Sequence, residues 1–259
     1  MLNERLKKIY LLRHILWDLT IKQLRTNYAG SRFGIWWAVF TPLILATSIN
    51  FIFTQVFKIN IPNYTLFALA GIIPWIFFVN ALSEVTQSFI VSSPILRQGI
   101  FPREFIPLSY ILAHFINFLI GFVFLLPLFI IANLKVVIYL PFLFAVILFH
   151  LVFLAGMGLF FSCINVFFRD ISHFLSVLFM IWFWVTPVFY PLGMLAYPFR
   201  WVCLLNPMTY YIVSYQQILF EVKAPSLFNL SLSIFIALFF LILGYTFFLK
   251  EEAGLLKKI

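Results

Sequence analysis

The chain has 259 residues, of which 64% are hydrophobic and only 10% are charged, whereas soluble domains average about 45–50% and about 25%. A soluble fold of this length has too little interior to bury so much apolar surface, so we exclude a soluble domain and expect an all-α membrane protein. The net charge of +9 would suggest a nucleic-acid partner in a soluble protein, but the basic residues flank apolar segments, where they orient a membrane protein, and we expect no nucleic acid.

The first segment, residues 2–25, is predicted to be an amphipathic helix that lies in the membrane interface. Arg5 and Arg13 fall on or beside its apolar face, so their side chains would have to extend toward water. The helix either touches a cytoplasmic partner or serves only as a topological anchor, and both interpretations remain open. The apolar residues recur every three or four positions, the period of one helix face: Leu2, Leu6, Ile9, Leu12, Leu16 and Leu19.

Seven uncharged stretches reach the length of about 20 residues that a helix needs to cross a bilayer. The first 32 residues and the C-terminal tail are both rich in Lys and Arg, which predicts that both termini are cytoplasmic. Two cytoplasmic ends require an even number of crossings, so one stretch does not cross. The six predicted transmembrane helices, which form a single transmembrane domain over residues 1–259, are 35–57, 64–91, 105–132, 137–164, 171–190 and 227–249.

Residues 201–220 are the stretch that we exclude as a span. Asn206-Pro207 interrupts it, and it is the most polar of the seven. Irregular backbone persists at membrane depth only where protein or a water-filled cavity shields it. We therefore predict a re-entrant helix pair between spans five and six, dipping in from the outer face, with Pro187 and Pro191 among the residues that interrupt the helices.

A short cytoplasmic element is predicted at 93–104, between spans two and three. Prolines and a glycine divide this loop, and it presents polar and aromatic side chains that would fit a groove on a partner: Gln98, Phe101, Arg103 and Glu104. Glu84, near the inner end of span two, is expected to form a structural ion pair with Arg97 or Arg103.

Several kinds of catalytic site are missing from the sequence. No G-x-x-x-x-G-K-[ST] run is present to bind ATP phosphates, and the four histidines have no partners at metal-ligand spacing, so we expect no cofactor and no metal in this chain. The spans hold almost no ionisable residues, which argues against ion-coupled transporters and proton pumps and predicts that a partner supplies the energy. Cys163 and Cys203 are expected to be buried thiols rather than a disulfide.

Aromatic residues make up 21% of the chain, and most are expected to face lipid or to pack between helices. Trp36 and Trp37 in span one, and Trp182, Trp184 and Tyr190 in span five, form two clusters. A flat ring surface suits a sugar ring that must slide past it. Because neighbouring helix positions point in different directions, one tryptophan of each pair is expected to line a channel, and we favour Trp37 and Trp182.

Over essentially its whole length, the chain resembles the permease subunits of type-2 ATP-binding-cassette exporters for O-antigen, capsule and teichoic-acid polysaccharides. Four departures are Arg32 at a usually apolar position, Thr41 where Asn is common, Gln98-Gly99 where basic residues are frequent, and Tyr215-Gln216-Gln217 where an Arg often follows the Asn-Pro motif. The resemblance rests on three groups of motifs in this order: Tyr28-Ala29-Gly30-Ser31 with Gly34, Trp37 and Pro42; Pro74-Trp75 with Phe101-Pro102-Arg103-Glu104 and Pro107-Leu108; and Arg169-Asp170 with Thr186-Pro187-Val188 and Asn206-Pro207-Met208.

The resemblance implies a half-transporter in the bacterial inner membrane. A second copy of the chain would complete a channel for a lipid-linked, O-antigen-like polysaccharide, and two nucleotide-binding subunits would hold ATP and Mg²⁺. The interface helix corresponds to 2–25, the coupling element to 93–104 and the outer gate helices to 191–220. The implied site residues are Trp36, Trp37, Phe40, Trp182, Trp184 and Tyr190 lining the channel; Gln98, Phe101, Arg103 and Glu104 at the ATPase; and Pro187, Pro191, Asn206 and Pro207 at the gate.

Two alternatives differ in substrate or in class. A type-2 exporter of drugs or lipids has the same architecture. An integral-membrane acyltransferase or glycosyltransferase is also basic and aromatic-rich, but it should carry facing carboxylates or a His/Asp pair at a membrane surface, and the sequence offers none.

Overall fold

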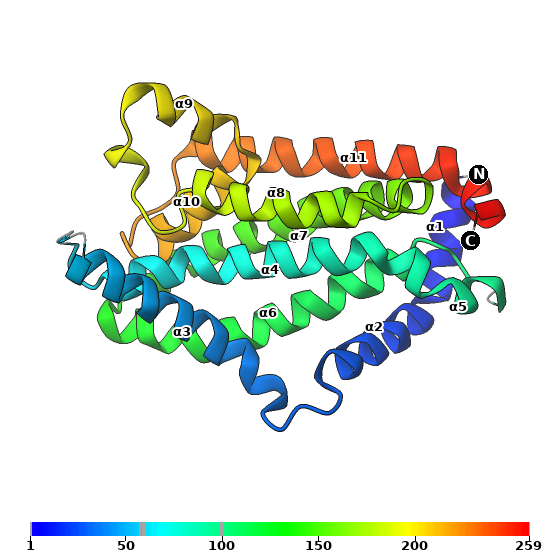
Figure 1. The fold of residues 1–259 in the computed structure, drawn as a ribbon, viewed down its shortest axis with the longest axis horizontal. Coiled ribbons are helices and arrows are strands. Elements are labelled where there is room, and N and C mark those ends of the chain that lie inside the picture. Colours follow the sequence, from blue (N-terminus) through cyan, green and yellow to red (C-terminus); the bar gives the residue numbers. More distant parts are fainter. Residues whose placement is uncertain (1, 57, 59–60, 99–100, 259) are drawn as a thin grey trace.

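The computed structural model describes residues 2–56, 58, 61–98 and 101–258, and every regular element in these ranges is helical (Figure 1). Gln98 ends a helix, but its side chain lies outside the described part, as do residues 99 and 100 of the predicted coupling element. The elements are α1 (Leu2–Leu11), α2 (Arg13–Tyr28), η1 (Gly34–Trp36), α3 (Trp37–Phe51), η2 (Ile52–Val56), α4 (Tyr64–Val91), α5 (Ser93–Gln98), α6 (Phe105–Ala132), α7 (Val136–Phe167), α8 (Ile171–Val185), η3 (Leu192–Met194), α9 (Tyr197–Leu205), α10 (Pro207–Leu219) and α11 (Leu227–Lys258).

Within the described residues, five helical segments are long and apolar enough to cross a bilayer, which makes the chain a multi-pass membrane protein. They are Gly34–Val56, Tyr64–Val91, Phe105–Ala132, Val136–Phe167 and Leu227–Leu255.

Helix α8 is apolar but shorter than the predicted span 171–190, because it ends at Val185. Its 15 residues extend about 22 Å. The helix ends there because Thr186 precedes Pro187, and a residue before proline is pushed out of the helical region; Thr186 is extended, with ψ at 135°.

Helix α4 is the central element of the bundle. It packs against α3, α6, α7, α8 and α10, and 72% of its most apolar stretch is buried inside the protein. Neighbouring helices cover most of α4, so its few exposed polar residues, such as Asn80 and Gln87, mark the parts of its surface that no other helix covers.

Helices α7 and α11 form the most extensive helix pair. They cross where two glycines meet: a Cβ added to Gly244 would lie 2.0 Å from the carbonyl oxygen of Gly156. Only residues without a side chain allow the two backbones to approach so closely, as at other crossings of membrane helices.

The predicted helix 2–25 is present as two helices that meet at Leu12, whose φ and ψ of −95° and 13° are not helical. Helix α2 packs along α6 and buries Thr20 completely, and Leu19 contacts the core. Part of the apolar stripe is therefore used for packing within the protein.

The two chain termini lie at the same end of the bundle, together with α1 and α5 (Figure 1). Helices α9 and α10 lie at the opposite end (Figure 1). Cys163 and Cys203 are both free and buried, as expected.

Candidate functional site

Asn206 joins the end of α8 to the junction of α9 and α10. Its Oδ1 accepts hydrogen bonds from Trp182 Nε1 at 2.6 Å and from the backbone N–H of Met208 at 2.9 Å. Its Nδ2 donates to Thr186 Oγ1 at 2.7 Å. The bond to Met208 caps α10, whose first residue, Pro207, has the φ that a helix start requires. One buried amide thus fixes three chain segments.

The irregular segment after α8 is held by side chains from α4 and α10. Gln216 Nε2 donates to the carbonyl of Pro187 at 2.8 Å, and the Tyr64 hydroxyl donates to the carbonyl of Phe189. Pro191 is extended and directly precedes η3. Protein side chains therefore satisfy two backbone carbonyls of the irregular segment that follows α8, which is the condition for irregular backbone at membrane depth.

Trp36, Trp37 and Phe40 form an exposed aromatic patch at the start of α3. Their side chains are 48%, 45% and 38% exposed, although they contact one another. The Trp36 ring also contacts Phe124 of α6, with centroids 5.4 Å apart. Both tryptophans keep an accessible surface, and their place in a channel stays a prediction.

The two tryptophans of α8 differ in their surroundings. Trp182 is half-buried against Phe78, with its ring nitrogen bonded to Asn206, whereas Trp184 is 65% exposed. Tyr190 packs beside this end of α8 and donates to the Trp184 carbonyl at 3.0 Å. Trp182 is therefore the less accessible of the two rings in one copy of the chain, and which of them lines a channel stays a prediction.

A groove of about 580 Å³ runs between α4 and α8 and has Trp184 in its wall. Among the residues that the structure describes, its lining is aromatic and aliphatic, with two hydroxyls, Ser83 and Ser176, and no charged side chain. This surface is an uncharged aromatic wall to which α4 contributes as well as α8, and its contact with a substrate stays a prediction.

Four charged side chains join three distant chain segments at the end of the bundle that holds the termini. Arg5 donates from Nε and Nη2 to both carboxylate oxygens of Glu104, at 2.8 and 2.7 Å, and from Nη1 to Glu252 at 2.7 Å. Arg103 Nη1 lies 3.4 Å from Glu252 Oε1. The hydrogen bond to Glu104 is the largest cause that raises the pKa of Arg5 above its ordinary value, so the guanidinium stays charged.

These contacts define what the coupling element presents on the surface. Glu104 is buried, at 1% side-chain exposure, and both of its oxygens are bonded to Arg5. Phe101 and Arg103 line a groove of about 650 Å³ together with α1 residues such as Lys8. A contact of Phe101 and Arg103 with an ATPase remains a prediction. Glu104 would not touch the ATPase directly but would hold Arg5 in place beside it.

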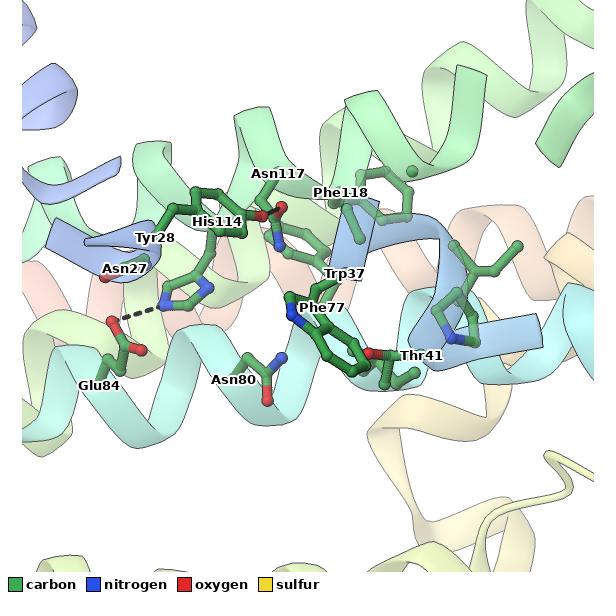
Figure 2. A pocket seen from close by; sticks show the side chains of 15 residues that line it. Asn27, Tyr28, Trp37, Thr41, Phe77, Asn80, Glu84, His114, Asn117 and Phe118 are labelled. Atoms are coloured by element: carbon green, nitrogen blue, oxygen red, sulfur yellow. Dashed lines mark hydrogen bonds and ion pairs between the residues drawn. The ribbon is translucent and has the colours of Figure 1, made fainter. Parts of the chain in front are cut away.

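A polar cavity lies where α2, α3, α4 and α6 meet (Figure 2). Its volume is about 200 Å³. Glu84 Oε2 lies 2.8 Å from His114 Nε2, a contact that is an ion pair when the imidazole is protonated. Gln23 donates to the same carboxylate at 3.3 Å, and the Tyr28 hydroxyl donates to Asn117.

The sequence interpretation missed this cavity and expected Arg97 or Arg103 as the partner of Glu84. His114 is the partner because α6 packs along α4, whereas Arg103 lies beyond the start of α6, against Glu252. The sequence did contain one indication of this pair. Ionisable residues are rare in the predicted spans, and Glu84 and His114 are two of the few that occur there.

A profile of the ABC-2 type transporter family matches residues 15–220. The chain is 33% identical over 201 residues to the O-antigen export system permease protein RfbA of Klebsiella pneumoniae, which covers 77% of this chain and 78% of that protein. It is 30% identical over 228 residues to the protein of the same name from Myxococcus xanthus, covering 85% of each. The chain therefore belongs to the ABC-2 type transporter family.

Proposed function

We propose that the chain is the membrane subunit of an exporter that moves a lipid-linked, O-antigen-like polysaccharide across the bacterial inner membrane. The observation that carries this proposal is the similarity, over about three quarters of the chain, to proteins named as O-antigen export permeases. The uncharged aromatic groove between α4 and α8 supports it, because such a wall offers ring faces to sugars without holding them by charge.

A separate ATPase supplies the energy in this proposal and brings ATP and Mg²⁺, since the chain has no phosphate-binding loop of its own. The groove lined by Phe101 and Arg103 is the proposed contact surface. A second copy of this chain completes the channel, and each copy binds one ATPase subunit.

The proposed topology has six crossings and cytoplasmic termini. The ion pair between Arg5 and Glu252 supports this, because it holds both end segments at one end of the bundle. The proposed crossings are the five long apolar segments, which hold α3, α4, α6, α7 and α11, together with the shorter apolar α8. The short α8 is the fifth crossing, and α9 and α10 form the re-entrant outer gate that includes Pro187, Pro191, Asn206 and Pro207.

The proposal is tested by depleting the chain in its host and measuring the glycan on both sides of the inner membrane. We expect surface glycan to be lost and lipid-linked glycan to accumulate on the cytoplasmic side, with the same result on depletion of the ATPase that copurifies. A chain that exports drugs or lipids would leave surface glycan unchanged. A glycosyltransferase or acyltransferase would alter the structure of the glycan instead of its location.

A further inference from the structure

The polar cavity between α2, α3, α4 and α6 has no role in the proposed function as stated above. Asn80 and Glu84 enter it from α4, His114 and Asn117 from α6, and Trp37 from α3 (Figure 2). Polar and ionisable side chains in a membrane helix bundle are costly unless they are paired or serve a function. The chemistry of the lining shows what kind of molecule would fit.

The lining combines acceptors, donors and ring faces but has no strong cation. One carboxylate and one imidazole are present, and no Lys or Arg in the described part of the chain lines the cavity. Sites for phosphate groups use Arg, Lys or helix N-termini, and Glu84 would repel an anion. Amide side chains both donate and accept hydrogen bonds, and a carboxylate accepts them from hydroxyl groups. The matching ligand is neutral and rich in hydroxyls.

The two ring systems in the cavity wall add an apolar surface. Trp37 and Phe77 both line the cavity, next to the amides of Asn80 and Asn117. Ring faces beside hydrogen-bonding groups suit a sugar, which has C–H faces and a rim of hydroxyls. The volume of about 200 Å³ is below the range of about 300–1,000 Å³ for drug-sized ligands, so the cavity holds one sugar unit rather than several.

The cavity is accessible and adjoins the α4–α8 groove. Trp37 is 45% exposed, and the Glu84 side chain is 41% exposed. Val79 and Ser83 line the groove, and the residues that follow each of them, Asn80 and Glu84, line the cavity. Successive residues of a helix diverge by about 100°, so the groove and the cavity occupy adjoining faces of α4.

The tyrosine at the end of α2 closes one side of the cavity. Burial raises the pKa of Tyr28 above its ordinary value, which keeps its hydroxyl protonated while it donates to Asn117. The same cavity therefore joins the N-terminal helices to the transmembrane bundle.

We propose that this cavity binds one neutral sugar unit of the exported glycan through Glu84, Asn80, Asn117 and the Trp37 ring. The inference rests on the proposed function, because it takes the glycan as the molecule that reaches this surface. Glu84 lies 20 residues, about 30 Å, along α4 from Tyr64, so the subsite lies in the half of the bundle nearer the chain termini.

The test places a photo-crosslinking amino acid at one position of the full chain, expressed with its ATPase in cells that make the glycan. The positions are 80 in the cavity, 184 in the groove and, as a control, 144 on α7, where Phe144 is 70% exposed. Glycan attached to the denatured protein is then measured. We expect adducts at 80 and 184 and none at 144. Adducts at 184 without adducts at 80 would overturn the subsite but leave the proposed function standing, whereas no adduct at either position would contradict both.

A second arm separates the sugar from the lipid pyrophosphate. Mild acid cleaves a sugar pyrophosphate bond, so an adduct formed through the lipid part loses its glycan, whereas one formed through a sugar keeps it. We expect the adduct at 80 to keep its glycan, and its loss would overturn the proposal of a neutral sugar ligand.

A third arm tests the role of Glu84 itself. Glu84→Gln should lower the adduct at 80 at least fivefold and change the adduct at 184 less than twofold. The matched control is Gln87→Ala, an exposed polar residue of α4 that does not line the cavity, and it should change neither. An unchanged adduct at 80 in Glu84→Gln would show that the pair with His114 is only structural. Equal thermal midpoints of the variant complexes exclude misfolding as the cause.

Discussion

Arg5 and Glu104, 99 positions apart in the chain, form a two-point ion pair in which both carboxylate oxygens accept a guanidinium hydrogen bond. Glu104 is almost completely buried, so the pair is shielded from water on the carboxylate side. Paired, planar contacts of this kind are stronger than single ones and fix orientation. The N-terminal helix is thereby held against the chain segment that enters α6.

Arg5→Ala should strongly destabilise the protein, because it leaves the Glu104 charge buried without a partner. Breaking a buried pair in this way costs about 3–5 kcal/mol. Glu104→Gln in the Arg5→Ala background should recover part of this loss, since no buried charge then remains. Thermal unfolding of the purified complex measures both effects.

The matched control is the exposed pair Lys223–Glu221, at 2.6 Å. Exposed pairs contribute about 0–1 kcal/mol, so Lys223→Ala should hardly change the unfolding midpoint. Equal effects of Arg5→Ala and Lys223→Ala would contradict the structural role of the Arg5–Glu104 pair.

Asn206→Ala should loosen the junction of α8, α9 and α10. The substitution removes the cap of α10, worth about 0.5–2 kcal/mol, and leaves Trp182 Nε1 and Thr186 Oγ1 without this partner. We expect faster proteolysis of the 186–206 segment in membranes. Asn133→Ala is the control, because Asn133 also bonds a helix-start backbone, the N–H of Lys135, but is exposed. Similar protection in both variants would refute the role of Asn206 as the central contact.

Long helices were predictable where apolar runs end at strong local signals. The predicted bounds 64–91 and 105–132 agree with those of α4 and α6 to the residue, because a polar residue directly precedes and follows each apolar run. The end of α8 was missed by five residues, although the effect of Pro187 on Thr186 is local and was available in the sequence.

Pairings between distant segments were not predictable. The partner of Glu84 and the burial of Glu104 depend on which helices become neighbours, and charge spacing along the chain carries no information on that. For the same reason, the sequence identified both α8 tryptophans as candidates but did not indicate that Asn206 would hold Trp182 in place.

Gly244→Val should prevent correct packing of α7 against α11. A Cβ at this position would lie 2.0 Å from the Gly156 carbonyl oxygen, which is backbone and cannot rotate away. We expect loss of folded protein in detergent, measured by size-exclusion chromatography of a fluorescent fusion. Gly193→Ala is the control, since a Cβ there meets nothing within 4 Å. A monodisperse Gly244→Val protein at normal yield would show that the helices can separate without harm.

Single cysteines at positions 226 and 253 should react with an impermeant maleimide from opposite sides of the membrane. They are introduced one at a time, as Ser226→Cys and Ala253→Cys, in a Cys163→Ser/Cys203→Ser background. These positions flank the apolar part of α11, which is 32 residues long and therefore long enough to cross. We expect 226 to react from outside in intact spheroplasts and 253 only in inverted vesicles. Reaction of both from the same side would rule out six crossings.

Trp184→Ala and Trp182→Ala should differ in kind. Trp184 is 65% exposed in the groove between α4 and α8, so its loss should reduce glycan export several-fold without lowering the thermal midpoint. Trp182 is half-buried, packs on Phe78 and donates to Asn206, so its truncation should cost about 3 kcal/mol of stability, the lower end of the range typical for buried aromatic side chains. Trp182→Phe keeps most of the packing but removes the hydrogen bond, and it should fall between wild type and Trp182→Ala in thermal midpoint.

Export from cells and unfolding of the purified complex, measured on the same three variants, check the prediction. If Trp184→Ala lowered the midpoint as much as Trp182→Ala, both rings would be packing residues, and the α4–α8 groove would lose its support as the route of the glycan.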